Sequence, residues 1–256
     1  MAASSRVVTR GLVLRETERG ESDKLLTVLS GDLGRIPVIA KGARSRRSKV
    51  TAAAQLLAYS ELVLSESHGW LYLSEAATLE LFQGVRQDVL LLSLASYLAQ
   101  LTEAVTPERS EAEEMLRLLL NALYALGTLK KPPELVKCAF TWRLLSLAGF
   151  EPLVQGCARC GKEQPEQPVL DVLQGLLLCQ SCREPGPRGL SMPLCPGSLA
   201  ALRHILYSPP EKLYAFTLKE ESLLRLNQAA EAFCAAQLER SFPTLDFYKT
   251  LSRQAL

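Results

Sequence analysis

The pattern of hydrophobic and polar positions changes its period about a third of the way along the chain. From residue 7 to about residue 77, β-branched and aliphatic side chains form short runs separated by turn-rich segments. These runs predict five strands, at residues 7–14, 24–29, 35–40, 57–64 and 70–74. Five strands in about 75 residues predict a small barrel, which fits an OB fold, the commonest five-stranded barrel among nucleic-acid binders, or an SH3-like barrel.

Beyond about residue 78 the apolar positions follow a helical period. Helices are predicted at residues 88–103, 110–126, 132–147, 197–207 and 218–240, and a last short one at 245–253. Ser110 followed by Glu113 fits a capping box, and Gly127 and Gly149 are natural helix stops. These helices are expected to form one another's core.

Four of the seven cysteines lie in two Cys-x-x-Cys pairs between the helical blocks. Cys157 and Cys160 are followed by 18 residues and then by Cys179 and Cys182. Each pair turns tightly enough to aim both sulfurs at one metal ion, and four thiolates close its coordination shell, so we predict one structural Zn²⁺ in a zinc ribbon. An iron–sulfur cluster, a redox pair and plain thiols are the alternatives. Cys138, Cys195 and Cys234 are expected to be ordinary core residues.

These patterns together predict an α+β protein of several domains. A five-stranded OB-fold barrel occupies residues 1–78, an all-helical domain occupies 79–152 and 190–256, and the four-cysteine zinc ribbon at 153–189 is inserted in the helical domain.

Charge is distributed unevenly, although the net charge is only +2. Residues 1–50 hold eleven Lys and Arg against five Asp and Glu, and the remaining 206 residues hold 18 against 22. Residues 41–49 contain five cations and no acid, a composition that suits a polyanion or, alternatively, a solvated loop without a partner. The candidate nucleic-acid contacts are the cations of this loop and of the barrel face: Arg10, Arg15, Lys24, Arg35, Lys41, Arg44, Arg46, Arg47 and Lys49. The barrel aromatics Tyr59, Trp70 and Tyr72 are interpreted as packing residues, and Glu21 and Asp23 as turn residues.

Several function classes are disfavoured by what the sequence lacks. No apolar run reaches the roughly 20 residues of a membrane span, and no signal peptide is recognisable, so we expect a cytoplasmic protein without a membrane. Neither common phosphate-binding glycine loop occurs, His68 and His204 lie in no nucleophile motif, and the acidic residues form no two-metal site. A binding protein that is not an enzyme is therefore the leading class.

Short motifs in a specific order resemble the RecO family of bacterial recombination mediators. The sequence GLVLR at residues 11–15 is followed by GESD at 20–23, LLT at 25–27, GR at 34–35 and KGAR at 41–44. Further on, RLL at 143–145 and GFEP at 149–152 lead into CARCG at 157–161. Residues 238–242, LERSF, depart from the more basic stretch that family members tend to have there.

The resemblance implies binding of single- and double-stranded DNA, annealing of complementary strands and, with RecR, loading of RecA onto DNA coated by single-strand-binding protein. It implies two protein partners, RecR and the acidic C-terminal tail of single-strand-binding protein, and a nucleoid-associated location. Candidate contacts for that tail are the cations near the third helix: Lys130, Lys131, Lys137 and Arg143.

Two other interpretations stay open from the residues alone. A nuclease or other DNA-modifying enzyme would need acidic ligands dispersed along the chain. A zinc-stabilised RNA-binding or ribosome-associated factor would share the basic barrel and the ribbon, and would prefer RNA in competition.

Overall fold

The chain forms two compact units in a computed structural model that describes residues 6–183 and 191–254. One unit comprises Met1–Leu129 and Phe242–Leu256, and the other comprises Lys130–Ser241. The three-part division at residues 1–78, 79–152 with 190–256, and 153–189 stays a prediction. The helices that directly follow the barrel belong to the same compact unit as the barrel.

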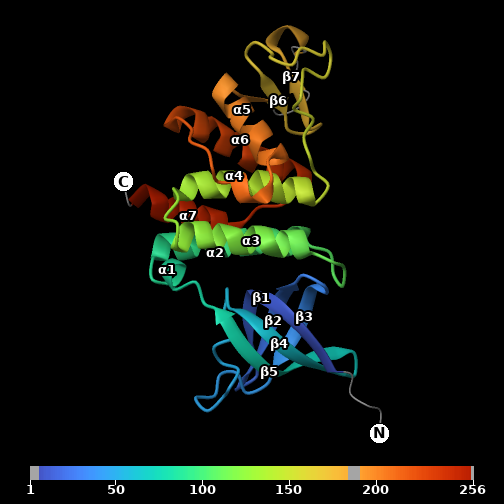
Figure 1. The fold of residues 1–256 in the computed structure, drawn as a ribbon, viewed down its shortest axis with the longest axis vertical. Coiled ribbons are helices and arrows are strands. Elements are labelled where there is room, and N and C mark those ends of the chain that lie inside the picture. The colour runs from blue at the N-terminus through green and yellow to red at the C-terminus, as the bar shows by residue number, and fades with distance from the viewer. Residues whose placement is uncertain (1–5, 184–190, 255–256) are drawn as a thin grey trace. The chain divides into compact units, whose positions relative to one another are not determined.

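A closed five-stranded barrel forms the N-terminal part of the first unit (Figure 1). Its strands are β1 (Arg6–Arg19), β2 (Asp23–Ser30), β3 (Gly34–Ala40), β4 (Tyr59–Ser67) and β5 (Trp70–Glu80). They are arranged in the order β1-β2-β3-β5-β4, antiparallel except where β3 pairs with β5. The five predicted strands are thus confirmed, several of them longer than the apolar run that indicated them, and the barrel is OB-like.

The segment between β3 and β4 supplies part of the barrel core. Val28, Val38 and Leu62 are fully buried inside the barrel. Ala54 and Val50, which follow the basic residues of the loop, belong to the same cluster, and the Ala54 amide donates to the Val50 carbonyl at 3.0 Å. The loop is therefore anchored at its base by apolar burial.

Three helices and a C-terminal helix complete the first unit. They are α1 (Gln83–Arg86), α2 (Val89–Val105), α3 (Glu113–Gly127) and α7 (Pro243–Gln254). Asp88 caps α2 by accepting from the Leu90 and Leu91 amides. The α7 helix packs on α2, where the rings of Tyr97 and Phe242 meet edge to face at 5.9 Å.

The predicted capping box at Ser110 is wrong. The N-cap of α3 is Ala112, which makes no side-chain cap, and its amide donates to the Gly31 carbonyl at 2.7 Å. Gly34, at φ +64°, lets the β2–β3 turn approach the segment before α3 very closely. A Cβ at this position would lie 2.1 Å from the Ser110 carbonyl oxygen. Packing against this turn therefore takes Ser110 out of the helix.

The second unit combines three helices with the cysteine ribbon. Its helices are α4 (Pro133–Leu147), α5 (Pro196–Tyr207) and α6 (Glu220–Leu238), with single turns η1 (Gln180–Cys182) and η2 (Pro210–Lys212). Trp142 on α4 packs on Phe233 of α6, with ring centroids 5.2 Å apart. Gly149, at φ +89°, ends α4 in a Schellman motif, in which the Phe150 amide donates to the Leu145 carbonyl.

The ribbon contains a three-stranded sheet. A hairpin of β6 (Val169–Asp171) and β7 (Leu176–Leu178) forms two of its strands, and β8 (Ser191–Pro193) joins the other edge of β6. Among the described residues, no helix is both long and apolar enough to cross a membrane.

Candidate functional site

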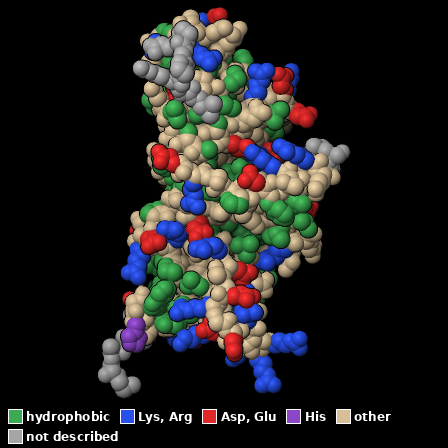
Figure 2. Space-filling model, turned by 180° about the vertical axis from the view of Figure 1, so that it is seen from behind, with side chains coloured by type: hydrophobic (Ala, Val, Ile, Leu, Met, Phe, Trp, Pro, Cys, Tyr) green, Lys and Arg blue, Asp and Glu red, His purple; other side chains and the backbone are tan. Residues whose placement is uncertain are grey.

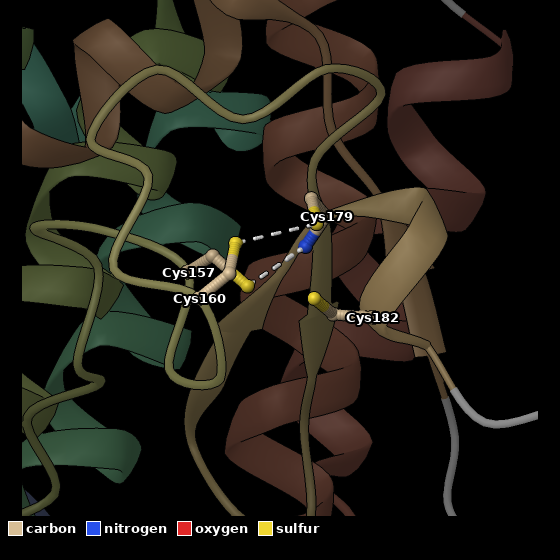
Figure 3. Close-up of side chains that lie close together, drawn as sticks. All are labelled: Cys157, Cys160, Cys179 and Cys182. Carbon is tan, nitrogen blue, oxygen red and sulfur yellow. Dashed lines mark hydrogen bonds between the residues drawn. The ribbon is translucent and has the colours of Figure 1, made fainter.

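The four cysteines of the two Cys-x-x-Cys pairs converge in the ribbon (Figure 3). Cys157 and Cys160 lie in the loop before β6, Cys179 directly follows β7, and Cys182 ends the η1 turn. All four sulfurs lie within 4.8 Å of one another, and those of Cys160 and Cys179 are 3.8 Å apart. Four sulfurs about 2.3 Å from a tetrahedral zinc ion would be roughly 3.8 Å apart. The donor set and its spacing therefore fit a tetrahedral metal ion.

Backbone amides point at these sulfurs and favour their ionised form. The Cys179 amide donates to the Cys157 sulfur at 3.4 Å. Burial raises the pKa of Cys157, but hydrogen bonds from the backbone of Cys160, Cys179 and Arg159 outweigh it and lower that pKa to about 6. Hydrogen bonding with Cys179 and Cys160 raises the pKa of Cys182 to about 12. A bound cation would thus favour ionisation of Cys182 beside Cys157, and four protein ligands would leave no position on it for a substrate.

The basic loop at residues 41–49 presents a second group of functional candidates. The exposed side chains of Arg46, Arg47 and Lys49 make no ion pair with any residue that the structure describes. Arg44 instead pairs with Glu18 at 3.2 Å and donates to the carbonyls of the β1–β2 turn. In Figure 2, Lys and Arg side chains project from the lower end of the barrel.

The base of this loop is tied to the β1–β2 turn. The Asp23 carboxylate accepts from the Gly42 amide at 2.8 Å, and the Arg44 amide donates to the Ser22 carbonyl at 2.9 Å. The hydrogen bond from Gly42 lowers the pKa of Asp23. Asp23 is therefore a structural residue that fixes where the basic loop leaves the barrel.

The predicted cations of the barrel itself already have carboxylate partners. Arg10 pairs with Glu61 at 3.7 Å, Arg15 with Glu103 at 2.9 Å and Arg35 with Glu108 at 3.0 Å. Lys24 differs from the other three, because its side chain is 17% exposed, pairs with Glu16 and donates to the Ala54 carbonyl. Lys24 therefore ties β2 to β1 and to the segment before β4, and it is not retained as a nucleic-acid contact.

Comparison with known proteins decides the family. A family model for the N-terminal part of recombination protein O matches residues 1–82, and a model for its C-terminal part matches residues 86–246. The chain belongs to the RecO family. "DNA repair protein RecO" of Acetivibrio thermocellus is 32% identical over 245 residues, which cover 96% of this chain and 97% of that protein. The protein of the same name from Heliobacterium modesticaldum is 35% identical over 210 residues, covering 80% and 75% of the two chains.

The cations predicted on the helical part of this RecO-family chain fall into two groups. Lys130 is exposed and Lys131 half-buried at the start of the second unit. Lys137 is 4% exposed and lies between Glu134 at 2.8 Å and Glu231 at 2.9 Å. It is therefore removed from the candidate partner contacts. Arg143 is half-buried and donates to the Ser208 carbonyl.

Sequence reasoning missed part of the barrel face. Trp70 was expected to be a packing residue, yet its side chain is exposed, and Arg19, which was not among the candidates, lies over its ring. The signal that could have shown it is alternation: Leu71 and Leu73 take the core face of this strand, so Trp70 must lie on the other face. Cys195, expected in the core, is half-buried at the N-terminus of α5, where its sulfur accepts from the Ser198 amide.

Proposed function

We propose that this chain acts in DNA repair and recombination by binding single- and double-stranded DNA with its barrel. The observation that carries the proposal is the group of exposed cations Arg46, Arg47 and Lys49, which have no ion-pair partner among the described residues and lie on a loop whose base is fixed by hydrogen bonds and apolar burial. Neutralising phosphates with such cations releases condensed counterions and gives affinity without sequence preference. The paired cations Arg10, Arg15 and Arg35 can join by exchanging carboxylates for phosphates, because exposed ion pairs contribute only about 0–1 kcal/mol.

The same electrostatics account for strand annealing. Two DNA strands resist pairing because their phosphates repel each other, and a protein that neutralises both lowers this barrier without a chemical step. We propose that the chain anneals complementary strands in this way, as a mediator and not as an enzyme. With RecR it would help to load RecA onto DNA coated by single-strand-binding protein.

For the tail of single-strand-binding protein, the proposal retains three of the four predicted cations. Lys130, Lys131 and Arg143 can meet a terminal carboxylate, whereas Lys137 is occupied by its two glutamates. For the ribbon, we propose one structural zinc ion held by the four cysteines. Its role would be to fold a segment that is too small to have a core of its own.

An annealing assay tests the proposed function. Two complementary labelled strands are coated with single-strand-binding protein and mixed without ATP, with and without the chain, at low and at high salt. Intact strands should anneal faster with the chain, and the acceleration should decline as salt rises. The variant R46E/R47E should lose most of it.

The matched control is R117E/R225E, which changes the net charge equally at exposed arginines outside the barrel. It should anneal like the unsubstituted chain. Strands that are cut would favour a nuclease. Stronger competition by RNA than by DNA would favour an RNA-binding factor, and no acceleration at low salt would refute annealing.

A further inference from the structure

Two aromatic side chains of β5 lie on the outside of the barrel. Successive residues of a strand point to opposite faces, so Trp70 and Tyr72 share one face and Leu71 and Leu73 share the other. Leu73 belongs to the barrel core and Leu71 packs against that core, which places the two aromatic residues on the outer face. Trp70 is 42% exposed and Tyr72 is half-buried. The Trp70 indole is thus open to solvent and is not part of the barrel core.

Each of these rings carries a cation. The Arg19 guanidinium carbon lies 5.5 Å from the centroid of the Trp70 ring, and the Lys41 Nζ lies 4.7 Å from that of Tyr72. Neither cation forms an ion pair with a carboxylate among the residues that the structure describes. Both distances are within the range of cation–π attraction. Each ring therefore has a cation beside it, and both cations act electrostatically on the nearby Asp23 carboxylate.

The position of these four side chains connects them to the basic loop. Lys41 is the first residue of that loop, and Arg19 ends β1 opposite Asp23, the residue that holds the loop through the Gly42 amide. On β3, Ile39 is directly opposite Tyr72, and Lys41 follows two residues later, on the same face. The aromatic pair thus lies at the edge of the surface to which we assign phosphate binding.

We infer that Trp70 and Tyr72 form a stacking platform for the unpaired bases of single-stranded DNA, with Arg19 and Lys41 beside the rings as phosphate or base-stacking contacts. The inference deepens the proposed function and rests on it. Every base offers an apolar face, and an aromatic or guanidinium plane can stack on it whatever the sequence. Bases inside a duplex are already stacked on one another, so the platform favours single strands, while the basic loop binds both forms.

An exposed apolar residue elsewhere on the same strand provides a contrast. Leu79 is 48% exposed near the other end of β5, about 30 Å along an extended strand from Trp70. Leu79 has no aromatic ring, so it can neither stack on a base nor take part in a cation–π pair. The variant L79A therefore serves as the control for W70A and Y72A, because it removes exposed apolar surface from β5 without removing a ring.

The fluorescence of the chain itself reports on the platform. The chain contains two tryptophans, and the other one, Trp142, is fully buried against Phe233 in the second unit. The full chain is titrated with oligo(dT), with an abasic strand of the same length and with a duplex. Stacking on Trp70 should quench the emission with oligo(dT), and the abasic strand and the duplex should quench it much less. The variant W70F should lose the quenching but retain most of the affinity.

Affinities measured by anisotropy complete the test. W70A and Y72A should each weaken oligo(dT) binding about 5- to 100-fold and leave binding to the abasic strand and the duplex nearly unchanged. L79A should change none of the three. If W70A and Y72A bind oligo(dT) as the unsubstituted chain does, or weaken all three ligands equally, the platform is refuted while DNA binding stands. If the unsubstituted chain binds none of the three, the proposed function itself fails.

Discussion

The salt dependence of DNA binding gives the most direct measure of the basic loop. Replacing Arg46 and Arg47 by alanine removes two exposed cations that have no carboxylate partner among the described residues. Each phosphate contact contributes about 0.7 to the slope of log K against log salt for a single strand and about 0.9 for a duplex. If each arginine contacts one phosphate, the slope should become shallower by about 1.4 with single strands and by about 1.8 with duplex.

The assay measures the dissociation constants of labelled oligo(dT) and of a duplex of the same length at a series of salt concentrations. R46A/R47A is compared with R117A/R225A, which removes two exposed arginines that pair with glutamates on their own helices. The control should leave both slopes unchanged. Circular dichroism and thermal unfolding check that each variant is folded, and little change is expected because all four side chains lie on the surface.

Two results would refute this reasoning. Equal slopes for R46A/R47A and the unsubstituted chain would mean that the loop does not contact phosphates. Equal losses in R46A/R47A and in the control would mean that binding follows net charge and not this loop. The difference between the two variants is thus the quantity that decides.

Three further predictions concern stability and the metal. The purified chain should carry about one zinc ion, which C160S or a chelator should release. Loss of the ion should speed amide exchange in β6 and β7 but not in the barrel. Full retention of zinc by C160S would contradict the site. Burial raises the pKa of Asp32, but hydrogen bonds from Thr9 and Ser30 outweigh it and keep that pKa below 3.8. The ionised Asp32 therefore stabilises the fold above that pH, and D32N should lower the unfolding free energy by about 1 kcal/mol at pH 7, measured with urea. This deficit should shrink as the pH falls through 3.8 and below. A deficit independent of pH would contradict the prediction. K137M should lower the unfolding free energy by about 2 kcal/mol. Breaking a fully buried ion pair would cost more, but the glutamate partners of Lys137 are partly exposed. Unchanged stability with weaker binding of the tail of single-strand-binding protein would restore Lys137 as a contact.

Local pattern was sufficient for the elements and for the metal centre. The short apolar runs and the turn-rich breaks between them along the first 80 residues predicted the five strands, because each strand of a small barrel contributes apolar side chains to its core. The cysteine spacing predicted the cluster, because two tight turns and a hairpin leave the sulfurs little choice of position. The strand β8 had no comparable signal, since three residues with one apolar side chain show no period.

Long-range packing accounts for the rest. A sequence shows that Lys24 and Lys137 are charged but not that both are turned toward glutamates. The capping box at Ser110 failed because contact with Gly34, 76 residues earlier, competes with a local hydrogen bond. Similarly, the pairing of β3 with β5 brings Lys41 to Tyr72, and no local rule predicts that pairing.

The division of the barrel cations into paired and unpaired groups has a consequence for how a mediator would work. Arg15 and Arg35 must give up Glu103 and Glu108 before they can bind phosphates, so their net contribution to DNA affinity is smaller than that of Arg46 or Arg47. In the proposed binding mode, much of the affinity would then reside in a short loop and would be sensitive to competing ions. Such a surface would hold strands weakly and reversibly, and release is needed as much as binding if annealed DNA is to be passed on. Replacing Glu103 by glutamine should accordingly tighten DNA binding and slow the release of annealed product, whereas faster release would show that the ion pair has no such role.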